Sequence, residues 1–103
     1  MLVFASPLAA DQKTYAGEEA AALRCANTLA FTAIALEQSG GIGPLERDVM
    51  LDITVGILAG HVTGTWRQKK AALRVVRDRR DPLETVEDFQ RFAYQCLVQF
   101  PVN

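Results

Sequence analysis

Residues 17–38 read GEEAAALRCANTLAFTAIALEQ, and this stretch decides the fold. Alanine and leucine dominate it, and both have high helix propensity. Glu18 and Glu19 fall in the first turn, where the helix dipole favours acidic side chains. Ser39-Gly40-Gly41 follows as a stop signal. The sequence therefore predicts a helix over residues 17–38.

A second helix is expected from Pro44, because proline suits the first helical position. Its apolar pattern runs through Val49, Ile53 and Ile57 to about residue 79. Glycines and threonines in the middle of this stretch can bend or break the helix. The alternative makes residues 53–57 a strand, since β-branched residues are common there. It is less favoured because no second strand is available to pair with it.

The last helix has a clear start, because Asp81 can cap it and Pro82 occupies the first turn. An apolar residue then recurs every three or four positions until Pro101 ends the helix. With 103 residues, 50% apolar and 22% charged, the chain fits one domain. We expect an all-α fold, a small three-helix domain with a long middle helix that its glycines can kink.

The N-terminal segment, residues 1–15, is either leader-like or extended, and residues 16–103 form the helical domain. Residues 2–10 are apolar and end in small residues, which resembles the tail of a secretory signal. This pattern indicates a periplasmic or secreted protein, with a strand-like tail in a cytoplasmic protein as the alternative. No apolar run approaches the roughly 20 residues that a spanning helix requires, so no transmembrane segment is expected.

The two cysteines, Cys25 and Cys96, lie 71 positions apart, which is too far for local metal-ligand spacing. With His61 as the single histidine, no ordinary four-ligand zinc set can be assembled from sulfur and imidazole, and no metal or cofactor is assigned. In an exported protein the pair predicts one disulfide that ties the first helix to the last. The alternative is two buried thiols in a reducing cell.

Three glycines, Gly56, Gly60 and Gly64, are spaced four apart, which places them along one ridge of a helix. Another backbone can approach such a ridge closely. The expected partner is an alanine ridge of the first helix, made of Ala22, Ala26, Ala30 and Ala33. A homodimer seam, or a kink that shapes a pocket around His61, is the functional alternative.

Positive charge is concentrated in one segment. Residues 1–66 carry three basic and seven acidic groups, residues 67–80 seven and one, and residues 81–103 one and four. At helical spacing, one stripe of this segment contains Arg67, Lys70, Arg74 and Arg77. Such a stripe can bind phosphates, anionic lipid or an acidic protein, and an exposed Trp66 can add stacking. The more favoured account is neutralisation by acids of the same chain, either Glu84, Glu87 and Asp88 or those of the first helix.

No catalytic residue is assigned. His61 has no triad or metal cluster around it, and Glu46, Asp48 and Asp52 stand where helix starts favour acids. Two functions from different classes remain. The first is a small exported, non-enzymatic helical binding protein, disulfide-stabilised and monomeric or homodimeric, with Trp66 and the four cations as its binding residues for an anionic or acidic protein partner. The alternative is an intracellular regulatory domain that binds nucleic acid or an acidic protein through the basic helix, nucleic acid being the less favoured partner.

Overall fold

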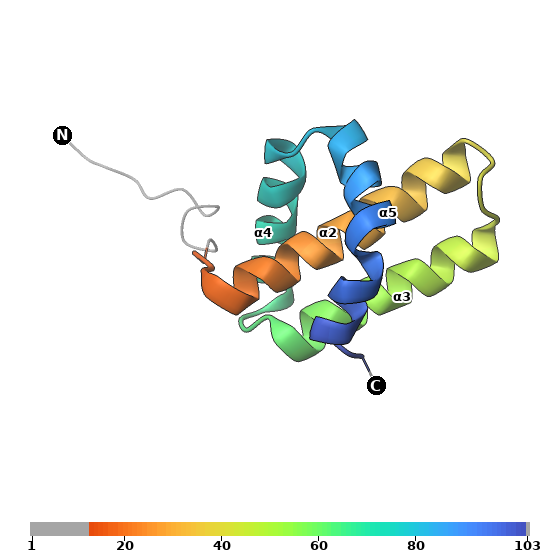
Figure 1. Cartoon of the computed structure of the whole chain (residues 1–103). Coiled ribbons are helices and arrows are strands. Elements are labelled where there is room, and N and C mark those ends of the chain that lie inside the picture. The colour runs from red at the N-terminus through yellow and green to blue at the C-terminus, as the bar shows by residue number, and fades with distance from the viewer. Residues whose placement is uncertain (1–12, 103) are drawn as a thin grey trace.

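The computed structural model describes residues 13–102, and its regular structure there is entirely helical. The helices are α2 (Gly17–Gln38), α3 (Pro44–His61), α4 (Trp66–Arg79) and α5 (Pro82–Gln99) (Figure 1). The all-α class is thus confirmed, and residues 53–57 are helical rather than a strand. The expected count of three helices is wrong, since this part of the chain has four.

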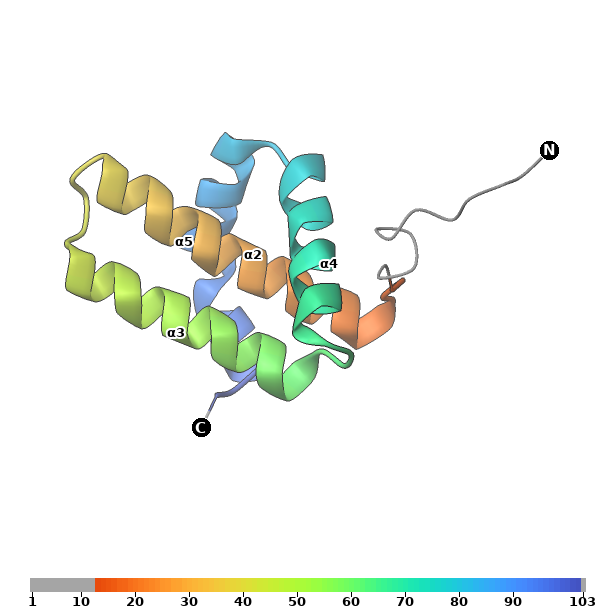
Figure 2. The same cartoon turned by 180° about the vertical axis from the view of Figure 1, so that it is seen from behind.

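Helix α2 is the centre of the fold and packs against each of the other three helices. Helix α3 runs alongside it, while α4 and α5 cross it on opposite sides (Figures 1 and 2). Three of the four alanines of its ridge, Ala22, Ala26 and Ala33, are inaccessible to solvent, and Ala30 is half-buried. Small side chains on this ridge let neighbouring helices approach closely. The helix ends as expected, because Gly40 takes a positive φ of 80° and Gly41 N donates to the Leu36 carbonyl at 2.7 Å.

The expected long middle helix is divided by the turn at residues 62–65 into α3 and α4, which are bent by 116° relative to each other. Gly64 has a φ of +103°, a conformation that glycine tolerates and that no α-helix contains. Thr65 then caps α4, since its Oγ1 accepts from Gln68 N at 3.1 Å and Gln68 Oε1 accepts from Thr65 N at 2.9 Å. This reciprocal cap starts a new helix instead of continuing the old one.

Residues near the start of α2 hold this turn in place through Thr63. Glu19 Oε2 accepts from both Thr63 N and Thr63 Oγ1 at 2.7 Å. Tyr15 OH donates to the Thr63 carbonyl at 2.6 Å, and Lys13 Nζ donates to Thr63 Oγ1 at 2.6 Å. The Thr63 hydrogen bonds lower the pKa of Glu19, whereas partial burial raises the pKa of Tyr15. The bend between α3 and α4 is therefore fixed from α2 and the residues before it.

Helix α5 begins where the sequence predicts, with Asp81 Oδ1 accepting from Glu84 N at 3.0 Å. At its end Phe100 turns inward and is 4% exposed. The core that α5 helps to close contains Ala22, Leu23, Cys25, Ala26, Leu29, Ile57, Leu58, Val62 and Phe100.

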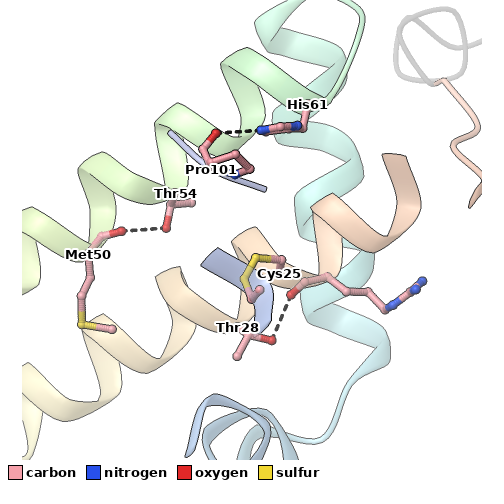
Figure 3. The surroundings of a disulfide bond; sticks show 8 residues. Cys25, Thr28, Met50, Thr54, His61 and Pro101 are labelled. Carbon is pink, nitrogen blue, oxygen red and sulfur yellow. Dashed lines mark hydrogen bonds between the residues drawn. A yellow bond between two sulfur atoms is a disulfide. The ribbon is translucent and has the colours of Figure 1, made fainter. Parts of the chain in front are cut away.

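Cys25 of α2 and Cys96 of α5 are paired as a disulfide, with their Cα atoms 5.6 Å apart, inside the range that such bonds require. Figure 3 shows the bridge lying between the ribbons of α2 and α5. The first described helix is thus tied to the last, as the cysteine spacing predicts. The leader-like stretch at residues 2–10 lies outside the described residues.

A search of residues 13–102 finds no single helix whose length and apolar character suit a membrane crossing. By those two criteria alone, α3 and α4 qualify only when taken together, as a pair broken by the 116° bend.

Candidate functional site

The cationic stripe of α4 faces solvent. Arg67, Lys70, Arg74 and Arg77 are all exposed, as their helical spacing predicts. They stand on the side of α4 turned away from the core, because Ala72, Leu73 and Val76 are the α4 residues that pack against it. We call Arg67, Lys70, Arg74 and Arg77 the α4 stripe.

Acids of the same chain neutralise only part of this charge. Arg77 Nε lies 3.2 Å from Oδ1 of its neighbour Asp78. Of the three acids expected to pair with α4, Asp88 does form an ion pair, but with Arg80, which lies beyond the stripe. Within residues 13–102, neither Lys70 nor Arg74 takes part in an ion pair. Intramolecular neutralisation therefore leaves two adjacent cations of the α4 stripe uncompensated.

Trp66, at the first position of α4, is 44% exposed. The Lys69 Nζ lies 4.8 Å from the centroid of its ring, at cation–π distance. Lys69 itself is only 7% exposed, so most of its side chain is buried beside the Trp66 ring. Sequence reasoning missed Lys69, although its spacing of three from Trp66 on a helix is the signal for such a pair.

A groove of about 460 Å³ separates the second half of α2 from α4. Its lining is mainly apolar and includes Phe31 and Ile34 of α2 and Leu73 of α4. Lys70, Arg74 and Arg77 also border it, so the α4 stripe forms one edge. We call this space the α2–α4 groove. The sequence carries no local signal for it, because its two walls are distant in the chain and meet only through the bend at residues 62–65.

The three spaced glycines meet three different surroundings. A Cβ at Gly56 would lie 2.8 Å from Val102 Cγ1, so the C-terminal tail approaches α3 closely there. A Cβ at Gly60 would meet nothing within 4 Å, and Gly64 lies in the turn. No α2 alanine is among the nearest atoms that a Cβ at these positions would meet. The expected ridge is lost because α3 ends at His61, before Gly64, and because the Cβ side of Gly56 faces the C-terminal tail.

Three of the remaining chemical candidates, His61, Glu46 and Asp48, have structural partners. His61 Nε2 lies 2.9 Å from the Pro101 carbonyl oxygen (Figure 3), and its ring meets Phe100 edge-on at 5.4 Å. Glu46 Oε2 accepts from Gly43 N at 2.9 Å, and Asp48 pairs with Arg47. Residues 13–102 contain no group of three or more His, Cys, Asp or Glu side chains arranged to hold a metal ion. These contacts anchor helix ends and the C-terminal tail.

Comparison with known proteins identified no relative of this chain. The chain matches no family model, no curated protein and no solved structure. Function is therefore inferred from the surface and the groove of the molecule itself.

Proposed function

We propose that this chain is a small exported, non-enzymatic binding protein whose helix α4 binds an anionic partner. One observation carries the proposal: Lys70 and Arg74 are exposed, adjacent on the helix and paired with no acid in residues 13–102. Charge alone attracts anions over a Debye length of about 8 Å at physiological ionic strength. The α4 stripe is therefore the surface through which association would occur.

The spacing of Lys70 and Arg74 does not by itself stabilise the helix. Like charges four residues apart destabilise a helix by about 0.2–0.5 kcal/mol. Lys70 and Arg74 have this spacing, and Arg77 follows three residues later. A bound anion would reverse the sign of this contribution, since each cation would then face an opposite charge. The unfavourable spacing supports a binding role over a purely structural one.

The location is supported by the cysteines. Disulfides persist in oxidising compartments such as the periplasm or the extracellular space, and they are rare in the cytosol. A bridge from Cys25 to Cys96 spans 71 positions, and this supports an exported protein over the intracellular regulatory alternative. Cell fractionation of the full gene product, combined with alkylation of free thiols and mass spectrometry, tests this part. Cytosolic retention with two reduced cysteines would defeat it.

The binding part is tested by titrating the protein with two probes, poly-L-glutamate and mixed-sequence double-stranded DNA, at low and physiological salt. We expect poly-L-glutamate to bind at low salt and to weaken as salt rises. Arg74→Gln should weaken this binding by about 1.5-fold to fivefold, the range for one exposed ion pair. Arg91→Gln is the matched control, because Arg91 is an exposed cation of α5 outside the α4 stripe.

Three results would contradict the proposal. The first is an absence of low-salt association with either probe. The second is an equal loss of affinity in the Arg91 and Arg74 variants, which would mean that overall charge, not α4, governs binding. The third is binding to DNA alone, which would favour the intracellular alternative.

A further inference from the structure

The geometry points to a ligand class for the α2–α4 groove: we propose that it binds a monomeric single-chain alkyl carboxylate, with Lys70 and Arg74 holding the carboxylate. The inference rests on the proposed function in one respect, since α4 supplies the charge. It goes beyond that function by naming a second wall and an apolar tail. The anionic partner then becomes a fatty-acid-like amphiphile rather than any anion.

The apolar wall comes from α2. Phe31, Ile34 and Ala35 line it, and Leu73 faces them from α4. Ile34 lines the groove and is 45% exposed, so its side chain is accessible to a ligand there. Each methylene that leaves water for such a wall strengthens binding about fourfold. An alkyl chain of modest length can therefore bind here without any polar contact along its tail.

The opposite edge suits one anionic head group. Arg77 borders the groove but is paired with Asp78, whereas Lys70 and Arg74 are unpaired within residues 13–102. Side chains four apart on a helix are neighbours, so both cations can approach a single carboxylate. Their methylene stems add apolar surface to the edge, as long basic side chains do when their charge stays in water. Two neighbouring cations match a single head group better than a long polyanion.

A third group in the same lining lacks a partner. Asn27 lines the groove and is 3% exposed, and its Nδ2 donates to no acceptor in residues 13–102. A buried donor without an acceptor is unfavourable, but this nitrogen is closed to solvent and so lies out of reach of a ligand in the groove as it stands. The groove thus combines two uncompensated cations and an apolar wall. Its volume of about 460 Å³ also lies within the range of small-molecule sites.

The test uses laurate below its micelle-forming concentration, with calorimetry for affinity and amide NMR for location. Undecyltrimethylammonium carries the same undecyl tail with the opposite charge, and acetate carries the head group without the tail. We expect saturable one-to-one binding of laurate, at least about tenfold weaker binding of the cationic amphiphile, and no measurable binding of acetate. Chemical-shift changes should concentrate in residues 27–38 and 70–77.

Two pairs of variants separate the two walls. Ile34→Gln should weaken laurate about tenfold by removing apolar contact, while Val98→Gln, at an exposed apolar position of α5, should leave it unchanged. Arg74→Gln should weaken laurate binding by about 1.5-fold to fivefold, while Arg91→Gln should not weaken it. Circular dichroism of each variant checks that the fold is retained.

Some outcomes overturn the inference. They are no laurate binding, binding that ignores both Ile34 and Arg74, binding lost only in the Ile34 variant, and association with anionic vesicles but not with monomeric laurate. Failure here is distinct from failure of the proposed function. If poly-L-glutamate still binds in an Arg74-dependent way while laurate does not bind, only the groove inference falls. If neither binds, both fall.

Discussion

Removing the Cys25–Cys96 bridge tests how much this disulfide contributes to the free energy of unfolding. The bridge closes a loop of 71 positions, which lowers the entropy of the unfolded chain by about 15 cal/mol/K. At 25 °C this corresponds to about 4 kcal/mol, a large share of the roughly 5–15 kcal/mol that stabilises a typical domain. Cys25→Ala/Cys96→Ala should lose that amount, since alanine adds no polar group to the core.

Urea unfolding followed by circular dichroism measures this loss. With a slope of about 1.5–2 kcal/mol/M, the midpoint should fall by about 2–3 M. A reducing agent should bring the native protein to the midpoint of the double variant and leave the double variant unchanged. A loss below about 1 kcal/mol in both the reduced protein and the variant would refute the loop-closure reasoning.

Two further predictions concern the turn between α3 and α4. Gly64→Ala should lower the free energy of unfolding by about 1–2 kcal/mol, because φ is +103° and a Cβ would lie 2.6 Å from Gln68 Oε1. Gly60→Ala should raise the free energy of unfolding by up to about 1 kcal/mol, because that helical position borders open space. If the urea midpoints of the two variants shifted in the same direction, this pair of predictions would be contradicted. The lowered pKa of Glu19 means that its contribution to stability is present above the ordinary glutamate pKa of about 4.3 and is lost as pH falls through the folded-state pKa. Between about pH 5 and pH 3 the Tm of the native protein should therefore fall faster than that of Glu19→Gln, and parallel curves would show that Thr63 does not favour the ionised carboxylate.

The parts of the fold that depend on local signals were predictable from the sequence. The bounds of α2 follow from its alanine-rich composition and from the glycines after Gln38. The start of α5 follows from Asp81 and Pro82, which act within one turn of the chain. In both cases the residues that decide the boundary are its immediate neighbours.

The glycines and threonines indicated that the middle helix could bend or break, but the position of the break was not predicted, although part of its signal is local. Thr65 and Gln68 have the spacing of a capping box, a local signal that was missed because the apolar pattern continues on both sides of it. What fixes the turn is Glu19, which binds Thr63 from 44 positions away. No periodicity in the turn itself encodes that contact.

The candidate site shows the same division. Exposure of Lys70 and Arg74 follows from helical periodicity, whereas their lack of acidic partners depends on where α5 lies. Phe31 and Ile34 could not be linked to these cations from the sequence, because only the 116° bend brings α4 across α2. The sequence thus predicted the exposed cations of the α4 stripe, but it could not predict the α2–α4 groove, which depends on tertiary structure.

The position of the bridge also makes the chain a covalent ring between Cys25 and Cys96. The loop at residues 39–43, the turn at residues 62–65 and the junction at residues 80–81 all fall inside this ring. A protease that cuts once at any of these sites opens the ring but releases no fragment. In a compartment rich in proteases, a nicked molecule would keep α4 linked to the rest of the domain, and only a second cut inside the ring would set a piece of it free.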